Sequence, residues 1–277
     1  MAGVCEIANS FSPQSCWAAQ TCQNRAYTFQ DPSSLKNIVN VSGSSDSTPF
    51  ISTFQPDNAS IANGNLVVSM ANGGNNKGFG STVMLNSDIG VGTYTARIKT
   101  ASVAPGVVSA FALRNNNNGD ELDFEWVGKS PNEVQTNYYW NGVLDYTNMV
   151  SHDVGANTSA DFHDYTFVVG QDSMQFIVDG KVARVLTKQS TFDAATNTYK
   201  FPGTKYSLFF SIWDGGNSGQ DGTAQWAGTP TPWGPNTVYT MHVNSLSVQC
   251  NSQPPTPPTS SVYTTTQVHY VTKCYAK

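Results

Sequence analysis

Hydrophobic and polar residues alternate over short stretches along the middle of the chain, a pattern typical of β-strands that bury one face. In residues 93–100, apolar Tyr94, Ala96 and Ile98 alternate with polar side chains. Asp179-Gly180 lies between two such stretches and is a strong signal for a tight hairpin turn. Further short stretches bounded by turn signals predict strands at residues 66–70, 119–128, 134–140, 165–169, 174–178, 181–185 and 238–248, and largely apolar runs predict buried strands at residues 107–113 and 206–213.

Many short strands at regular spacing predict an all-β fold, an antiparallel sandwich of two sheets. No stretch shows the 3.6-residue period over the roughly 12 residues that a typical helix needs. We expect the sheets to be curved, because the concave face of a curved sheet is a surface across which a long polymer can lie.

The chain divides by composition into three parts. Residues 1–24 hold three of the five cysteines and little periodicity, which indicates an irregular N-terminal arm pinned by disulfides. Residues 25–250 carry the strand pattern and form the predicted main domain. Residues 251–277 begin with a Pro/Ser/Thr-rich stretch, typical of an extended, O-glycosylated linker, and continue as a tail.

The strand predicted at residues 119–128 carries three acids on one side. Successive side chains of a strand point to opposite faces, so Glu121, Asp123 and Glu125 share one face and the apolar residues between them share the other. Like charges on one strand face repel each other, and no basic residue is interspersed to relieve them. A reason to keep such an arrangement is chemistry.

Paired carboxyl groups suit cleavage of a glycosidic bond, which needs one protonated acid and one nucleophile or base. The Cα atoms of Glu121 and Glu125 would lie about 13 Å apart. Side chains that lean together across a curved strand would bring their carboxyls to about 5–6 Å, near the separation of a retaining mechanism. Asp123 would raise the pKa of a neighbouring Glu or orient the nucleophile. The pattern alone also fits a calcium-ligating strand or an acidic exposed face.

Composition and charge narrow the classes of partner. Only 12% of the residues are charged and 23 are Gly, which is typical of turn-rich, secreted β-proteins. The net charge of -5 argues against nucleic acid or an anionic membrane as a partner, and it is compatible with a neutral polysaccharide. No apolar run reaches about 18 residues, so no transmembrane segment is predicted.

The cysteines are Cys5, Cys16, Cys22, Cys250 and Cys274, all near the two ends of the chain. No Cys-x-x-Cys pair exists and the four His are scattered, so disulfides fit better than a zinc site. Pairs Cys5–Cys16 and Cys22–Cys250 would staple the N-terminal segment to the end of the domain, although sequence leaves other pairings open. Cys274 would then be the unpaired one.

Three N-glycosylation sequons begin at Asn40, Asn58 and Asn157 and are consistent with secretion. No signal peptide is recognised, and Met1-Ala2-Gly3 shortly before Cys5 reads as the start of a mature chain. We expect a secreted glycoprotein, either free or attached to a membrane through a region that this chain lacks.

The segment Glu121-Leu122-Asp123-Phe124-Glu125 resembles the E-x-D-x-E strand of glycoside hydrolase family 16. The likeness spans about residues 50–250, and within the family it is strongest to the fungal cell-wall transglycosylases of the Crh type, which join chitin to β-glucan. Other segments similar to the family follow in its order, at residues 134–139, 141–142, 163–167, 176–181, 211–213 and 222–228.

This resemblance implies a concanavalin A-like β-jelly roll of two curved antiparallel sheets and retention of anomeric configuration. Carried over by motif position, Glu121 is the nucleophile, Asp123 its helper and Glu125 the general acid/base. The implied activity is cleavage of chitin and its transfer, through a covalent glycosyl-enzyme, to a β-glucan or chitin acceptor in the cell wall. We expect a monomer with no cofactor and no metal, since no ligand cluster specifies the structural calcium that such folds can carry.

Other interpretations remain open. A secreted endo-β-1,3(4)-glucanase of the same family would use the same acids with water as the acceptor. A non-catalytic, lectin-like sandwich would bind sugar, but it would have no use for Glu121 and Glu125 together. A structural wall protein is favoured only by the linker and the sequons.

Trp213 and Trp226 are candidate platforms on which sugar rings could stack. The alternative for Trp213 is a place in the core, whereas Trp226 lies in a Gly-rich stretch that predicts an exposed loop. Two nearby segments differ from the family's usual sequence, residues 214–216 (Asp-Gly-Gly) and residues 229–233 (Thr-Pro-Thr-Pro-Trp). Both are expected on the acceptor side, so the acceptor is left open.

Gln135, Asn137 and Tyr139 are predicted to share a strand face beside the acids, where they could hydrogen-bond sugar hydroxyls. The alternative is a polar face that only meets solvent. Arg114, just before the acidic strand, is a further substrate-binding candidate; equally, it could pair with a surface acid.

Overall fold

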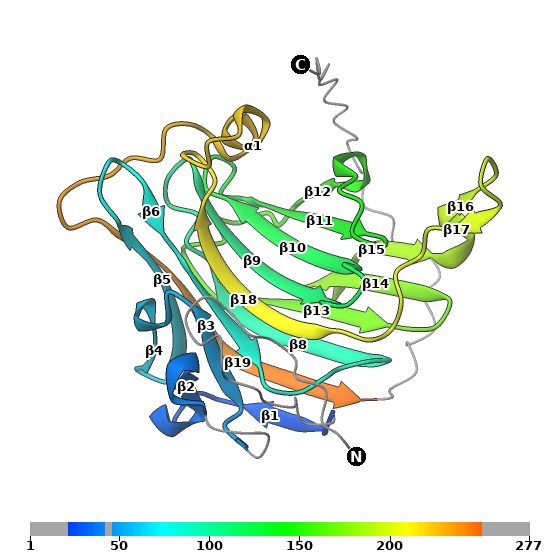
Figure 1. Ribbon diagram of the computed structural model, residues 1–277, viewed down its shortest axis with the longest axis horizontal. Helices are drawn as coiled ribbons and strands as arrows, with labels where there is room; N and C mark the ends of the chain where they lie inside the picture. The colour runs from blue at the N-terminus through cyan, green and yellow to red at the C-terminus, as the bar shows by residue number, and fades with distance from the viewer. Residues whose placement is uncertain (1–21, 42–45, 251–277) are drawn as a thin grey trace.

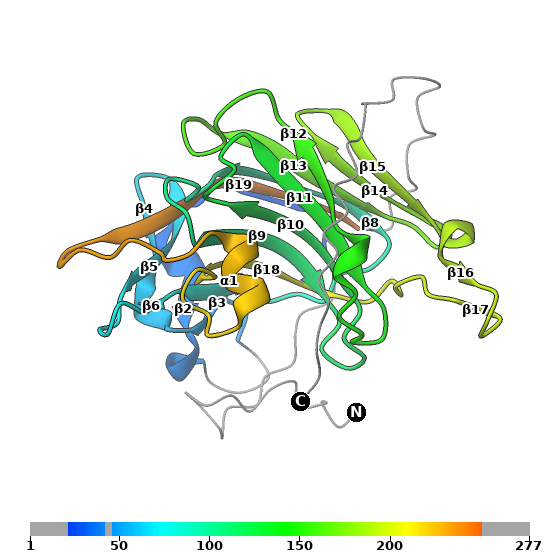
Figure 2. The ribbon, with the colours of Figure 1, turned by 90° about the horizontal axis from the view of Figure 1, so that it is seen from above.

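The computed structural model describes residues 22–41 and 46–250. Two β-sheets stack face to face and curve together, as Figure 1 shows, and Figure 2 shows the same two layers from above. The predicted all-β sandwich is confirmed. Its pairing is antiparallel except between β2 and β3, which run parallel.

One sheet has nine strands, with β1 and β6 paired to its main path at β19 and β5. In order across the sheet, the main path is β15 (Lys181–Thr187), β14 (Ser173–Val178), β13 (His163–Val169), β8 (Gly92–Lys99), β19 (Val238–Cys250), β5 (Asn65–Asn72) and β4 (Ala59–Ala62), with β1 at Arg25–Tyr27 and β6 at Gly78–Phe79.

The other sheet has eight strands and contains the acidic segment. Its order is β12 (Val150–Asp153), β11 (Glu133–Tyr139), β10 (Glu121–Val127), β9 (Val107–Arg114), β18 (Ser207–Asp214), β7 (Ser81–Leu85), β3 (Phe50–Phe54) and β2 (Leu35–Asn37).

A separate hairpin and a few short helices complete the described structure. They are β16 (Phe192–Asp193) with β17 (Thr198–Tyr199), the α-helix α1 (Asp221–Ala227), and the 3₁₀ helices η1 (Pro32–Ser34), η2 (Ile38–Asn40), η3 (Pro56–Asn58), η4 (Tyr146–Asn148) and η5 (Lys188–Thr191).

The predicted hairpin at Asp179-Gly180 is confirmed as the turn between β14 and β15. Both residues have positive φ, 47° and 75°, which a two-residue turn matching the strand twist requires. The exposed loop predicted around Trp226 is wrong, because residues 221–227 form α1. Ala227 is fully buried against Val108 and Val127, and this packing outweighs the low helix propensity of the glycine within α1.

The core lies between the sheets, and β10 is fixed into it by aromatic side chains. The ring of Phe124 packs 4.7 Å from that of Phe167, and Trp126 meets Tyr165 edge-on at 4.5 Å. All four rings are almost completely buried. Aromatic pairs of this kind add about 0.5–1.5 kcal/mol each beyond area burial, so β10 has one strongly preferred face toward the core.

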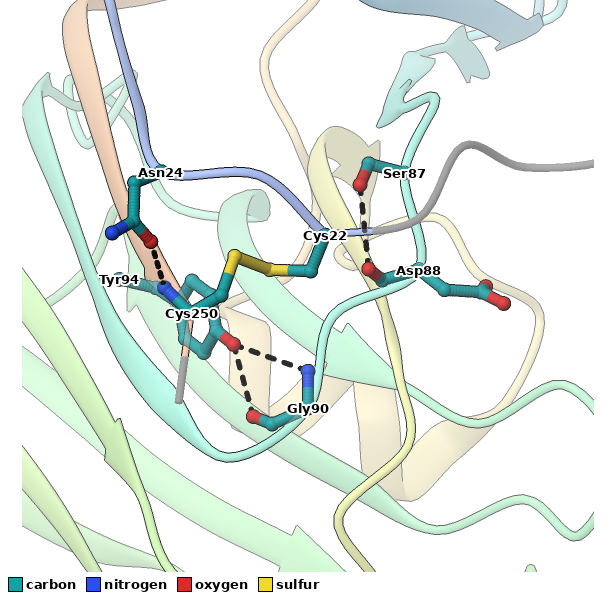
Figure 3. Close-up of a disulfide and its surroundings, with 7 residues drawn as sticks. All are labelled: Cys22, Asn24, Ser87, Asp88, Gly90, Tyr94 and Cys250. Carbon is teal, nitrogen blue, oxygen red and sulfur yellow. Dashed lines mark hydrogen bonds between the residues drawn. A yellow bond between two sulfur atoms is a disulfide. The ribbon is translucent and has the colours of Figure 1, made fainter. Parts of the chain in front are cut away.

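A disulfide joins Cys22 to Cys250, which confirms that predicted pair. Figure 3 shows it linking the segment before β1 to the end of β19, beside a hydrogen bond of 2.7 Å from the Cys250 N–H to the Asn24 side-chain oxygen. Because β1 also pairs with the end of β19, the first and last segments of the domain are joined both by the disulfide and by strand pairing. The predicted Cys5–Cys16 pair and Cys274 lie outside the described residues.

Candidate active site

The three acids lie near the middle of the eight-stranded sheet, on β10 between β9 and β11. Leu122, Phe124 and Trp126 are fully buried in the core. Their neighbours along the strand, Glu121, Asp123 and Glu125, therefore project from the opposite side of the sheet, away from the nine-stranded one. The predicted alternation along this strand is confirmed, and we call this side of the sheet the acidic face.

On β9 the acids have small neighbours. Ala112 lies opposite Asp123, and Ala110 lies opposite Glu125. A methyl group adds little bulk, so β9 places no large side chain opposite Asp123 or Glu125. The next strand, β18, continues the acidic face with Phe209, whose register partner is Ala112.

On β11 the acids have polar and aromatic neighbours. Tyr139, Asn137 and Gln135 lie opposite Glu121, Asp123 and Glu125, respectively, so their predicted common face is confirmed. The Asn137 side chain is buried, and its Oδ1 accepts a hydrogen bond of 2.9 Å from the backbone of Tyr138. Whether these three bind a sugar remains a proposal.

Tyr139, opposite Glu121, is within the electrostatic influence of all three acids. Burial raises the pKa of Tyr139, and the charges of Asp123, Glu125 and Glu121 raise this pKa further. Its hydroxyl therefore stays protonated and available as a donor. The exposed ring of Tyr146 meets the ring of Tyr139 edge-on at 6.3 Å and extends the aromatic surface beside Glu121.

Arg114 forms an ion pair with Glu121, at 3.4 Å between the guanidinium and the carboxylate. It lies opposite Glu121 across the β9–β10 pair. The sequence left open whether Arg114 binds substrate or pairs with an acid. It does pair with an acid, the predicted nucleophile, and its contact with substrate stays a prediction. Its positive charge favours the ionised form of Glu121.

Glu121 and Asp123 share a hydrogen bond that lowers the pKa of Glu121 and raises the pKa of Asp123. Burial raises the pKa of Asp123 well above its ordinary value, and the nearby charges and the bond to Glu121 act in the same direction. The pKa of Glu121 is also raised overall, with burial as the largest cause, and Arg114 and the bond from Asp123 limit that rise. A proton on Asp123 that is donated to an ionised Glu121 satisfies both groups.

Glu125 has a different environment. Burial, with the charge of Glu121 adding to it, raises the pKa of Glu125 to about 8. No arginine of the described residues pairs with Glu125 as Arg114 pairs with Glu121. At neutral pH Glu125 is therefore mainly protonated, the state required of a general acid.

Trp213 and Trp226 stack on one another near Glu125, with ring centroids 5.7 Å apart and an angle of 23° between the planes. We call them the tryptophan pair. The indole N–H of Trp226 donates a hydrogen bond of 2.7 Å to Gln135, the residue opposite Glu125. Both rings are only half-buried, and they pack on the small cluster that buries Ala227.

Two buried aspartates near the site were missed by sequence reasoning. Asp120, just before β10, accepts hydrogen bonds from the backbone of Asn141 (2.7 Å) and Gly203 (2.8 Å) and from the Asn118 side chain (2.9 Å), and so ties three loops together at the Glu121 end of β10. Asp214 plays a similar part at the end of β18. The Asx-turn signal of Asn118-Gly119-Asp120 could have indicated the first.

Within residues 22–41 and 46–250, no group of three or more His, Cys, Asp or Glu side chains is arranged to hold a metal ion. The same part of the chain contains no helix whose length and hydropathy would let it cross a membrane.

Comparison with known proteins places this arrangement in a family. The profile described as Glycosyl hydrolases family 16 matches residues 46–228, which include the whole of β10. The chain belongs to glycosyl hydrolase family 16. The resemblance found in the sequence is thus confirmed for the family.

Among relatives in family 16, Crh-like protein 2 of Aspergillus fumigatus is 33% identical over 262 residues, covering 91% of this chain and 57% of that protein. The chain therefore spans little more than half of that relative's length. A solved structure named Crh5 transglycosylase in complex with NAG is 25% identical, with a TM-score of 0.67, covering 84% of this chain and 87% of that one. A β-glucanase of Bacillus licheniformis shares the fold, with a TM-score of 0.65 at 20% identity over 84% of this chain and all of the other.

The raised pKa of Glu125 predicts how stability depends on pH. In the folded protein this pKa is about 8, against an ordinary value of 4.5, so the folded state holds a proton that the unfolded chain releases. This stabilising contribution is complete below about pH 4.5 and is lost as pH rises through about 8. Glu125→Gln cannot ionise, so its free energy of unfolding should fall less over this window, by on the order of 4 kcal/mol.

Urea unfolding at pH 5 and pH 8.5 measures this difference. Glu133→Gln is the matched control, because Glu133 lies on the neighbouring strand and its carboxylate accepts from Ser151. It should follow the wild type. If the Glu125→Gln and wild-type proteins lose stability in parallel, Glu125 does not hold the proton.

Proposed function

We propose that Glu121 is the nucleophile, Asp123 its helper and Glu125 the general acid/base of a retaining glycosidase/transglycosylase. The observation that carries the proposal is the unequal treatment of like carboxyls on one strand. Glu121 has Arg114 at 3.4 Å and a bond from Asp123, both of which favour its ionised form. The pKa of Glu125 is raised to about 8, which favours its protonated form.

The reaction then runs in two balanced steps. In the first, Glu121 attacks the anomeric carbon while Glu125 gives its proton to the leaving oxygen, and the glycosidic bond breaks as a glycosyl ester forms. In the second, ionised Glu125 takes a proton from an incoming hydroxyl, whose oxygen attacks the anomeric carbon and releases the Glu121 carboxylate. Two inversions retain the configuration. Asp123 holds its hydrogen bond to Glu121 whenever that carboxylate is free.

The substrates that we propose are chitin as donor and β-glucan or chitin as acceptor. The similarity to Crh-like protein 2 and to a transglycosylase structure named with NAG supports this choice. The tryptophan pair, Gln135, Asn137 and Tyr139 would contact the sugars. Arg114 would act on the site through Glu121. Transfer is favoured over hydrolysis when an acceptor is held beside the glycosyl ester and water is kept away.

The other interpretations use fewer of these features. A lectin-like module gains nothing from two half-buried carboxyls with opposed protonation, which cost folding free energy. An endo-β-1,3(4)-glucanase would use the same acids, and it differs only in the acceptor. The choice between transfer and hydrolysis therefore belongs to a product assay.

Glu121→Gln tests the nucleophile. We expect both transfer and hydrolysis to fall by about 10⁴-fold, because the first bond-making step is lost while the shape of the side chain is kept. Thermal unfolding should show an intact fold, and Glu133→Gln should keep its activity. Undiminished activity in Glu121→Gln would refute the mechanism.

A second assay identifies the acceptor. Chitin oligosaccharides are incubated with a labelled β-1,3-glucan oligosaccharide, and the products are weighed by mass spectrometry. We expect hybrid products that contain both sugars. Shortened donors with no hybrid product would contradict the transglycosylase and support a hydrolase, while unchanged donors would contradict both.

We also propose that the protein acts outside the cell or in the cell wall and carries N-linked glycan. The Cys22–Cys250 disulfide fits an oxidising compartment, as do the Crh-like relatives. Among the sequons, Asn157 is exposed, and the next residue, Thr158, is fully buried, so the sequon is held firmly at the surface. Asn58 is half-buried, and its Nδ2 donates a hydrogen bond of 2.9 Å to the backbone of Phe79.

The structure therefore predicts glycan on Asn157 and little or none on Asn58. The test is to secrete the protein from a eukaryotic host and remove its N-glycans enzymatically in H₂¹⁸O. Each glycosylated Asn then becomes an ¹⁸O-labelled Asp, which peptide mass spectrometry detects. Asn157→Gln is the control that should lose the label. A secreted protein modified at Asn58 but not at Asn157 would contradict the prediction.

A further inference from the structure

The carboxylate of Asp214, the last residue of β18, accepts five hydrogen bonds. The donors are the backbone N–H of Gly78 (2.7 Å), the backbone and side-chain N–H groups of Asn217 (3.0 and 3.2 Å), the indole N–H of Trp233 (3.1 Å) and the hydroxyl of Thr231. Asp214 is 7% exposed. A buried carboxylate surrounded only by donors is a strong fixed point, because each donor would otherwise be left without that partner.

These bonds close the long connection between β18 and β19. Asn217 lies at its start, whereas Thr231 and Trp233 lie near its end, so one carboxylate holds both ends of the segment that contains α1. Backbone bonds support the closure, since the N–H groups of Gly215 and Gly216 both donate to the carbonyl of Gly106. Figure 1 and Figure 2 both show α1 beside the ends of β9 and β18.

Thr231 and Trp233, at the end of this segment, pack tightly against the glycines that face them. A Cβ atom on Gly216 would lie 2.5 Å from the hydroxyl oxygen of Thr231, and one on Gly78 would lie 2.3 Å from the ring of Trp233. The N–H of Gly106 donates to the carbonyl of Ala227, the last residue of α1. Any shift of the closed ends is therefore passed to the helix, because neither side chain nor backbone can give way alone.

The helix in turn positions Trp226 beside Gln135, the residue opposite Glu125. Trp226 stacks on Trp213 and donates to Gln135, which lies opposite Glu125. Trp213 immediately precedes Asp214 in β18, so both members of the tryptophan pair are attached to the segment that Asp214 closes. An incoming sugar must approach Glu125 in the second step of the proposed reaction.

We propose that Asp214 is a positioning residue that holds the tryptophan pair beside Glu125 and thereby sets how much glycosyl ester goes to a sugar rather than to water. Asp214 acts through the pair and does not touch the reacting atoms. An acceptor sugar that stacks on an ordered aromatic surface is held for attack, whereas water needs no such surface. The inference rests on the proposed transglycosylase function, and its structural half can be tested without activity.

Asp214→Asn is the test variant. Each oxygen of Asp214 accepts from at least two donors, so an amide nitrogen at either place would face donors. We expect the ratio of transfer to hydrolysis to fall roughly tenfold while consumption of the chitin donor continues, because the acids of β10 are untouched. Asp172→Asn, whose side chain is 84% exposed and far from this network in sequence, is the control of equal charge and should match the wild type.

Circular dichroism provides a readout that does not need activity. Two stacked indoles give a coupled pair of bands in the far ultraviolet, and Trp226→Phe defines the spectrum without that coupling. Asp214→Asn should lose most of the coupling while its sheet signal remains. If Asp214→Asn cannot be purified folded, Thr231→Val and Trp233→Phe, which each remove one donor, should show smaller changes in the same direction.

The outcomes separate the two proposals. A wild type that does not act on chitin refutes the proposed function, while the circular dichroism still decides whether Asp214 holds the pair. An active wild type and an Asp214→Asn variant with the same product ratio refute the inference. A changed ratio with full indole coupling also refutes it, because Asp214 would then act by another route.

Discussion

The structure depends on the way in which β10 is held between two different environments. Its apolar residues pack into an aromatic core against the opposite sheet, and this packing leaves the acids only one side on which to lie. Repulsion among three carboxyls would be relieved if the strand turned over or frayed. The buried rings of Phe124 and Trp126 prevent both, because either movement would expose them to water. Core packing thus imposes the proximity of the acids.

That imposed proximity produces chemical differences between like groups. Removal from water favours the neutral form of every carboxyl. The carboxyl that stays ionised is the one with a nearby positive charge and a hydrogen-bond donor. Arg114 provides that support at the Glu121 end of the strand. An arginine at the last position of β9, with alanines at the two inward positions before it on the same face, is enough to make the two ends of β10 unequal. The division of labour between the two Glu side chains therefore comes largely from the neighbouring strand.

Much of this organisation could be predicted from sequence. Alternation identified strands such as β8, whose buried positions repeat with a period of two, and it placed Gln135, Asn137 and Tyr139 beside the acids, whereas β9 was found as an apolar run because it is buried on both faces. The short strands before residue 65, β6, β7, β12 and the β16–β17 hairpin were missed, since two to five residues give too little periodicity. The α1 helix was read as a loop, since its stability comes from the burial of Ala227 against distant strands. Asp120 and Asp214 were missed for a related reason, as their donors come from loops that meet only in the folded chain.

The Cys22–Cys250 bond has a topological consequence for the domain. With a sequence separation of 228 residues, it turns nearly the whole sandwich into a single covalent ring. A protease that cuts one peptide bond in any loop within that ring opens it but releases no fragment, and the strands on either side of the cut remain linked. Two cuts are needed before a piece can leave, and that piece must also be withdrawn from its sheets. The ring thus makes the domain tolerant of a single break in its backbone.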